Sequence, residues 1–188
     1  MNSTFESERL YLRALEIDDH HVVHKWRRDP GYQAGVLSTK RMTSLETEKK
    51  WIERAIAEHE EGKTLRFAIV TKESESFIGL VFLTDIDHMH RRAGSGSWIG
   101  EKEHRGKGYV TEARHLVVRY AYEELGLRRI EAHILASNSA SIRSVENFGY
   151  KKEGVLRDHT YKNGKANDVV VFSLLDRDYY EMYEIDNA

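Results

Sequence analysis

The feature that most constrains the fold of this chain is a strand pattern, a long helix pattern and a second strand pattern in succession. The strand patterns are Ser95–Gly100 and Arg129–Leu135, and the helix between them ends at Gly126. Its apolar residues recur on one face, at Ala113, Leu116, Val117, Tyr120, Ala121 and Leu125. A crossover of this length joins parallel strands in a right-handed unit. The chain is therefore predicted to be an α/β or α+β protein, with helices packed on a mixed sheet.

Five further strands are predicted from alternating or apolar runs bounded by turn residues. They are Arg9–Ala14, Leu65–Thr71, Phe77–Asp85, Val155–Lys162 and Asn167–Leu175. The polar segment Lys72–Ser76 predicts an antiparallel turn between the second and third of these. The dipeptide Asn163-Gly164 predicts a hairpin between the last two, because Asn and Gly tolerate the positive φ angles of a tight turn.

Three further helices are predicted from capping residues and apolar periodicity. One runs from Asp18 or Asp19 to about Arg28, one begins at Thr43, and one covers Ser139–Asn147 and ends at Gly149. Pro30 is a local stop signal after the first helix, and Thr43 has capping-box spacing to Glu46. The inward-facing residues of the first two helices are expected to be Val22, Val23, Trp26, Leu45, Ile52 and Ile56.

Composition narrows the functional classes. The 188 residues carry a formal net charge of -2, which provides no field for holding nucleic acid or an anionic membrane. Since the chain has no cysteine, a disulfide framework, a thiolate zinc site and a cysteine nucleophile are excluded. No apolar run approaches the roughly 18 residues that cross a bilayer, and no signal-peptide pattern is present. Without repeats or linkers, residues 1–188 are predicted to form a single cytoplasmic domain.

The segment Arg105-Gly106-Lys107-Gly108-Tyr109 carries the chemistry, because it lies between a strand and the long helix. A turn with little side-chain bulk lets successive backbone N–H groups converge on an anion, and the helix N-terminus adds roughly half a positive charge. With two basic side chains beside it, a pyrophosphate is the expected ligand. The alternative is that the glycines only permit a tight turn. The segment matches neither a P-loop nor a dinucleotide fingerprint.

Together with Val110, this segment resembles the Arg/Gln-x-x-Gly-x-Gly/Ala signature of the GNAT superfamily of acetyl-CoA-dependent N-acetyltransferases, with valine replacing the usual small last residue. The resemblance is greatest to the RimJ/RimL-like branch and covers essentially the whole chain. The matching segments are Glu8–Arg13, Ile99–Tyr109, Asn138–Ser141, Glu146–Tyr150, Gly154–Arg157 and Asn163-Gly164. It implies a mixed, mostly antiparallel seven-stranded sheet with splayed parallel central strands and flanking helices.

The resemblance also implies a ligand and the residues that bind it. Acetyl-CoA is the co-substrate, with its pantetheine arm between the two parallel strands. The cofactor-binding residues implied are Trp98, Ile99, Gly100, Arg105, Gly106, Lys107, Gly108, Tyr109, Val110 and Asn138. The first three act through backbone groups, and a backbone N–H near Ile99 is the implied donor to the oxyanion. For Asn138, the position suits a helix N-cap equally well.

For the catalytic groups, the resemblance implies Ser141 as the residue that assists the departing thiolate. Many relatives, including spermidine acetyltransferases, instead have a tyrosine at the position of Val145. The alternative for Ser141 is a helix serine that hydrogen-bonds backbone. RimJ/RimL-like chains often place a glutamate where this chain has Gly94. The base is therefore left open between water and the carboxylates Asp85, Asp87 and Glu101.

The acceptor is predicted to be a primary amine, either a peptide or protein N-terminal α-amine or a small amino compound. An α-amine titrates near about pH 8 and a lysine-like amine near about 10.4, so the former is easier to deprotonate without a strong base. A polyamine acceptor is the alternative, because the segment Asp87–Ala93 resembles that of spermidine acetyltransferases and the second predicted helix is acidic. The protein is expected to be a monomer or homodimer.

A different class of function is compatible with two departures from the family pattern. Val145 and Gly94 favour a catalytically silent acyl-CoA-binding regulatory module. The pairs His88-x-His90 and His20-His21-x-x-His24 have no convincing third ligand, so no metal site is predicted.

Overall fold

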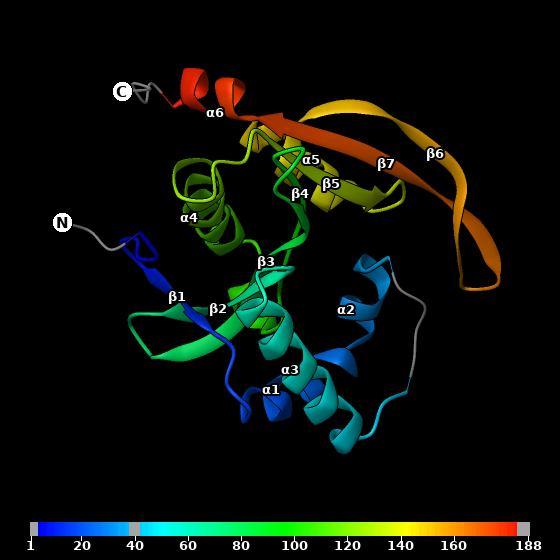
Figure 1. Ribbon diagram of the computed structural model, residues 1–188. Helices are drawn as coiled ribbons and strands as arrows, with labels where there is room; N and C mark the ends of the chain where they lie inside the picture. Colours follow the sequence, from blue (N-terminus) through cyan, green and yellow to red (C-terminus); the bar gives the residue numbers. More distant parts are fainter. Residues whose placement is uncertain (1–3, 38–41, 184–188) are drawn as a thin grey trace.

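A computed structural model describes residues 4–37 and 42–183 and contains one seven-stranded sheet (Figure 1). The strands are β1 (Leu10–Ala14), β2 (Leu65–Thr71), β3 (Ser76–Asp87), β4 (Arg92–Ile99), β5 (Arg129–Leu135), β6 (Lys151–Lys162) and β7 (Lys165–Leu175). Their order is β1-β2-β3-β4-β5-β7-β6. All neighbours are antiparallel except β4 and β5. The predicted mixed, mostly antiparallel sheet with one central parallel pair is confirmed.

Helices cover both faces of this sheet. They are α1 (Asp19–Arg27), α2 (Pro30–Gly35), α3 (Leu45–Glu60), α4 (Tyr109–Glu123), α5 (Ser139–Phe148) and α6 (Asp176–Met182), with a 3₁₀ turn, η1, at Lys102–His104. In Figure 1, strands β2 and β3 pass between α4 and α3. One hydrophobic core joins the sheet to α4, α5 and α6, and a second joins it to α1 and α3. No helix of the described residues is long and apolar enough to cross a membrane.

The structure corrects the predicted start of one helix and adds a short helix that was not predicted. The N-cap of α3 is Ser44, whose side chain accepts a hydrogen bond from the Thr47 N–H. The predicted cap, Thr43, instead donates its hydroxyl proton to Glu48. Leu45 is exposed because it lies in the first turn, before the helix reaches the sheet. Pro30 ends one helix but also begins α2, since proline is accommodated at the first helical position.

The parallel pair separates soon after it forms. β4 and β5 pair only from Arg92 with Arg129 to Gly94 with Glu131. Beyond this point β4 pairs only with β3, and β5 only with β7. Where the strands part, the Ser95 hydroxyl donates to the Glu131 backbone carbonyl at 2.9 Å. The two central strands therefore form a wedge that widens toward the N-terminus of α4.

Candidate active site

A cavity of about 1330 Å³ occupies the wedge between β4 and β5. Elements α2, α4 and α5 and the ends of β3, β4 and β5 contribute to its walls. Of the residues predicted to bind the ligand or take part in catalysis, those that line it are Trp98, Ile99, Arg105, Gly106, Gly108, Tyr109, Val110, Asn138 and Ser141. Gly100 and Lys107 are predicted ligand-binding residues that do not line this cavity.

The glycine-bearing loop leaves the start of α4 open to a ligand. Gly106 and Gly108 have φ angles of +74° and +86°, a left-handed conformation that side-chain-bearing residues seldom adopt. Gly108 is the N-cap of α4, and within the described ranges no side chain caps this end. The first backbone N–H groups of a helix have no partner inside the helix. An anion at this end would therefore meet free donors and the positive end of the helix dipole.

The loop is braced from the N-terminal segment rather than from within. Arg9 donates from Nη1 to the Lys107 carbonyl at 3.0 Å, and its Nε lies 2.8 Å from Glu112 Oε2. Ser7 donates its hydroxyl to Glu112 Oε1 at 2.6 Å. Although partial burial raises the pKa of Glu112, the hydrogen bonds from Ser7 and Arg9 outweigh it and hold the pKa below its usual value. The first turn of α4 is thus fixed while its N–H groups stay available.

Arg105 holds the end of β4 instead of presenting a free charge. Its Nε donates to the Ile99 carbonyl at 3.0 Å, and its Nη2 to the Gly100 carbonyl at 2.7 Å. Nη2 also lies 2.8 Å from a carboxylate oxygen of Asp29, the N-cap of α2. The positive charge that Arg105 brings to the loop is thus already paired with Asp29, while contact of Arg105 with a pyrophosphate stays a prediction.

The backbone of β4 turns selected N–H groups into the wedge. The Gly100 N–H donates to the Ile78 carbonyl at 2.8 Å. Hydrogen-bonded and non-hydrogen-bonded pairs alternate along an antiparallel ladder, so Trp98, two residues before Gly100, also bonds to β3. Ser97 and Ile99 lie at the alternate positions, and their backbone N–H groups therefore point away from β3 and into the wedge. The predicted backbone contact is thus available at Ile99 but not at Trp98 or Gly100.

Gly100 has a steric reason to be glycine. A Cβ atom at this position would lie 1.9 Å from the indole ring of Trp26. Both of its backbone polar groups are already bonded within the protein. Gly100 therefore lets Trp26 pack beneath the end of β4 and is not placed to contact a ligand through its own amide.

Two titratable side chains that the sequence analysis missed lie where the parallel strands separate. Glu131 is paired with Gly94 of the adjacent strand, so the Glu131 side chain lies on the face of the sheet where Gly94 has no side chain. Its Oε1 accepts from Arg129 Nε at 2.8 Å, and its Oε2 lies 3.4 Å from His133 Nε2. Burial raises the pKa of Glu131, but contacts with Arg129 and His133 bring it below its usual value. Only the register between β4 and β5 reveals that these two residues of one strand lie beside Gly94.

The three carboxylates predicted as candidate bases lie in different surroundings. Asp85 is exposed and lines the cavity at the end of β3. Asp87 accepts the His90 backbone N–H at 2.9 Å, which is the main cause of its lowered pKa. Glu101 accepts from the indole of Trp26 at 2.8 Å and pairs with a lysine; partial burial opposes these contacts, yet its pKa is lowered. Neither Asp87 nor Glu101 lines the cavity.

The N-terminal half of α5 forms the opposite wall. Asn138 caps the helix by accepting the Ser141 N–H at 3.2 Å, and its Nδ2 donates to the Gly35 carbonyl at 3.2 Å. The N-cap role considered for Asn138 is confirmed, while contact with a ligand stays a prediction. Within the described ranges the Ser141 hydroxyl has no hydrogen-bond partner, which speaks against the backbone-bonding alternative. Val145 is 4% exposed and also lines the cavity.

Helix α2 is held over the cavity by the long β6–β7 hairpin, which arches over one side of the molecule in Figure 1. Lys162, near the hairpin turn, donates to the Gln33 carbonyl at 2.6 Å and to the Val36 carbonyl. These carbonyls lie at the negative end of the short helix. Tyr32 of α2 packs edge-on against Trp98, with ring centroids 4.5 Å apart, and burial raises its pKa to about 12. A neutral aromatic wall thus faces the end of β4.

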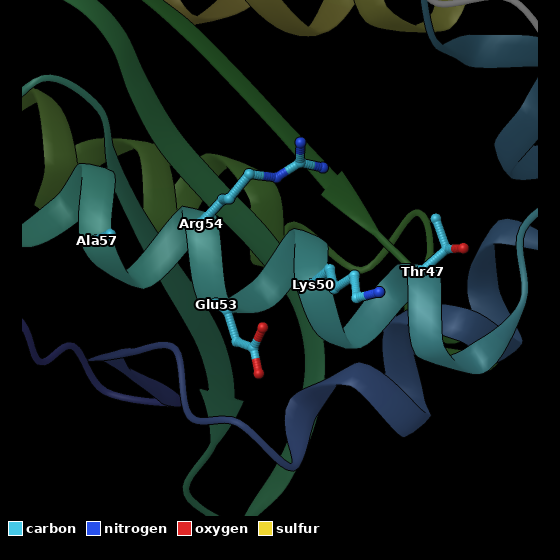
Figure 2. Close-up of a pocket in the computed structure, with 5 residues that line it drawn as sticks. All are labelled: Thr47, Lys50, Glu53, Arg54 and Ala57. Carbon is cyan, nitrogen blue, oxygen red and sulfur yellow. The ribbon is translucent and has the colours of Figure 1, made fainter.

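A second hollow, of about 490 Å³, lies along α3 (Figure 2). Its lining residues are Thr47, Lys50, Glu53, Arg54 and Ala57. Figure 2 shows Glu53 and Arg54 pointing in different directions from one helix, so no set of groups converges there. Among the described residues, no group of three His, Asp or Glu side chains could hold a metal ion.

Comparison with known proteins places these features in context. Residues 9–151 match the acetyltransferase (GNAT) domain. An uncharacterized N-acetyltransferase, p20, of Bacillus licheniformis is 34% identical over 94% of this chain and 98% of its own. The putative ribosomal N-acetyltransferase YdaF of Bacillus subtilis is 38% identical over 55% of this chain and 56% of its own. The crystal structure of spermidine N-acetyltransferase from Vibrio cholerae with CoA and spermine superimposes with a TM-score of 0.81 and 25% identity, over 90% of this chain and 97% of that one.

Proposed function

This chain belongs to the GNAT family of N-acetyltransferases, which use acetyl-CoA, and we propose that its acceptor is the α-amine at the N-terminus of a peptide or protein. The observation that carries the proposal is the wedge between β4 and β5, which is open at the uncapped end of α4 and narrows toward Gly94, where the two strands still pair. The pyrophosphate of the donor would bind at the start of α4. The pantetheine arm would then follow β4 past Ile99.

The reaction requires a neutral amine, a donor to the oxyanion and a stable leaving group. We assign the N–H of Ile99 as the oxyanion donor, because the ladder turns it into the wedge. For the base we assign His133, since histidine is the side chain that changes protonation in the neutral range. Glu131 then acts as a positioning residue: its Oε2 lies 3.4 Å from Nε2 of His133 and accepts a hydrogen bond from it, which leaves Nδ1 to receive a proton from the amine.

The charged residues of the cavity around β4 and β5 favour an α-amine over a polyamine as the acceptor. Glu131 is already paired with Arg129, and Arg92 of the lining lies 3.7 Å from Asp87, a carboxylate outside the cavity. Asp85 is left as the unpaired carboxylate among the described lining residues. A polyamine carries several positive charges and needs several free anions, whereas a peptide N-terminus carries one charge followed by a neutral chain.

The acidic residues of α3 and its C-terminal end were one reason to consider a polyamine acceptor, but most of them form ion pairs with basic side chains. Glu48 is fully buried and lies 3.3 Å from Arg27, and Glu58 pairs with Arg66 at 2.5 Å. Among the relatives, YdaF is named for ribosomal N-acetylation and the Vibrio enzyme for spermidine, so names alone do not choose between these acceptors.

The acceptor is tested by offering acetyl-CoA with peptides of different N-termini, spermidine and free amino acids, and by identifying the products by mass spectrometry. We expect acetylated peptide N-termini at higher kcat/KM than any polyamine product. Preferential acetylation of spermidine would contradict the acceptor assignment. Coenzyme A binding without thiol release from any amine would instead identify a silent acyl-CoA-binding module.

Replacing Ser141 with alanine tests its assignment as a hydrogen-bond donor to the leaving sulfur. Because one neutral hydrogen bond contributes about 0.5–1.5 kcal/mol, we expect kcat to fall by up to about tenfold, with little change in coenzyme A affinity. Steady-state kinetics with calorimetric binding separates these effects. Ser139→Ala is the matched control, since Ser139 is exposed and does not line the cavity. Unchanged turnover in Ser141→Ala would leave this residue a structural role only.

A further inference from the structure

Arg114 is a buried cation without an acidic partner. It lies in α4, and only 9% of its surface is exposed. Within the described ranges no carboxylate forms an ion pair with it, and the nearby Tyr150 and Tyr183 are neutral phenols because burial raises their pKa. Burial lowers its pKa, as expected when a charge loses water and gains no anion. Arginine remains protonated even so, and a charge buried in this way normally has a partner.

The guanidinium lies between α4 and α5. Its Nη1 is 3.1 Å from the Ser144 carbonyl and 3.3 Å from the Ser144 hydroxyl. Its central carbon is 5.1 Å from the ring centroid of Phe148 and 6.0 Å from that of Tyr150. A guanidinium has five N–H donors, and to the residues that the structure describes Arg114 donates from Nη1 alone. Arg114 lines the cavity, so its other donors are available to a ligand there.

The surface of α5 that meets Arg114 is the one that faces the cavity. Ser141, Ser144 and Val145 are spaced three and four residues apart, so they share one side of the helix, and all three line the cavity. Arg114 contacts the middle one of these. Val145 has no proton to donate. Arg105, which lines the cavity beside the glycine-bearing loop, is already paired with Asp29.

We infer that Arg114 stabilises the thiolate that leaves when the amine displaces coenzyme A. This inference rests on the proposed acetyl transfer. The amine nitrogen bonds to the acetyl carbon, the carbon–sulfur bond breaks, and its electron pair stays on sulfur. The proton of the amine passes to the base, and the thiolate, paired with the guanidinium, later takes a proton from solvent. Because Arg114 is only 9% exposed, this pairing is stronger than in bulk solvent, and among the described residues no carboxylate is paired with the guanidinium.

The test is the pKa of the coenzyme A thiol bound to the protein, measured by the ultraviolet absorbance of the thiolate during a pH titration. In the wild-type complex we expect it about one unit or more below that of free coenzyme A, since an adjacent opposite charge favours the ionised form. Arg114→Gln should return the pKa to the free value, and Arg114→Lys should keep part of the shift. Arg143→Gln, which removes the same charge from an exposed lining position, should leave the shift intact.

A bound thiol pKa equal to or above that of free coenzyme A in the wild type would overturn the inference, whether or not the variants fold. So would an Arg114→Gln protein that binds coenzyme A weakly but keeps the lowered thiol pKa, because Arg114 would then contact another part of the ligand. Turnover of Arg114→Gln should fall about 100-fold in kcat with little change in KM, at the lower end of the range for losing one electrostatic donor. Absence of coenzyme A binding to the wild type would instead contradict the proposed function.

Discussion

Replacing Gly108 with valine is expected to weaken coenzyme A binding at least about 100-fold while the protein stays folded. Gly108 is the N-cap of α4 with a φ angle of +86°. A side chain there would strain the backbone and occupy the space above the free N–H groups of the first turn. Losing two charge-assisted hydrogen bonds of about 1.5 kcal/mol each corresponds to a reduction of this size. Isothermal calorimetry measures the affinity, and thermal denaturation measures the stability.

Gly62→Val is the matched control for this experiment. Gly62 has a φ angle of +68° in the turn after α3, and a Cβ there would meet no atom within 4 Å. Both variants therefore place a branched residue in the left-handed region, at a cost of about 1–2 kcal/mol in stability. Only Gly108→Val should lose affinity. If it bound coenzyme A as the wild type does, the assignment of the phosphate loop would be wrong.

Replacing His133 with phenylalanine is expected to lower kcat/KM about 100-fold at neutral pH, the usual scale for loss of a general base. The loss should shrink as the pH rises toward about 8, because an α-amine is then increasingly neutral without help. Glu131 should remain ionised throughout this range, since its pKa is below the usual value. A pH series of kcat/KM with a peptide acceptor measures the effect.

The control for His133 is His90→Phe, because His90 is exposed in the turn after β3 and does not line the cavity. Its activity should match that of the wild type at every pH. A loss in His133→Phe that is the same at all pH values would indicate a positioning role instead. Wild-type activity in His133→Phe would show that His133 is not the base and would leave Asp85 or water as the candidates.

Much of the fold could be predicted because its signals are local. The apolar stripe of α4 and the alternation of polar and apolar residues in β5 predict which faces of these elements are buried. Asn163-Gly164 forms the predicted turn between β6 and β7. Errors arose where two neighbouring residues competed for one role, as Thr43 and Ser44 did at the start of α3. The cap is decided by which side chain reaches the free N–H group, and spacing alone does not state this.

From its residues alone, without the family resemblance, the candidate site was predictable only in the part that is continuous in sequence. The loop from Arg105 to Val110 combines glycines with a helix start, and its position in the structure follows from that local pattern. The pairing of Arg105 with Asp29 and the loss of the Gly100 amide to Ile78 join segments that are distant in sequence. No local pattern reports such contacts.

By itself, the sequence determined the order and type of the main elements, the parallel crossover and the glycine-bearing start of α4, because periodicity, capping and turn chemistry depend on residues close together in the chain. Only the tertiary structure decided that Glu131 stands beside Gly94 and that Arg114 is buried against α5 without a counter-ion. Register between strands and packing between helices are set by the whole core. The charges and proton acceptors of the cavity therefore became visible only once the chain was folded.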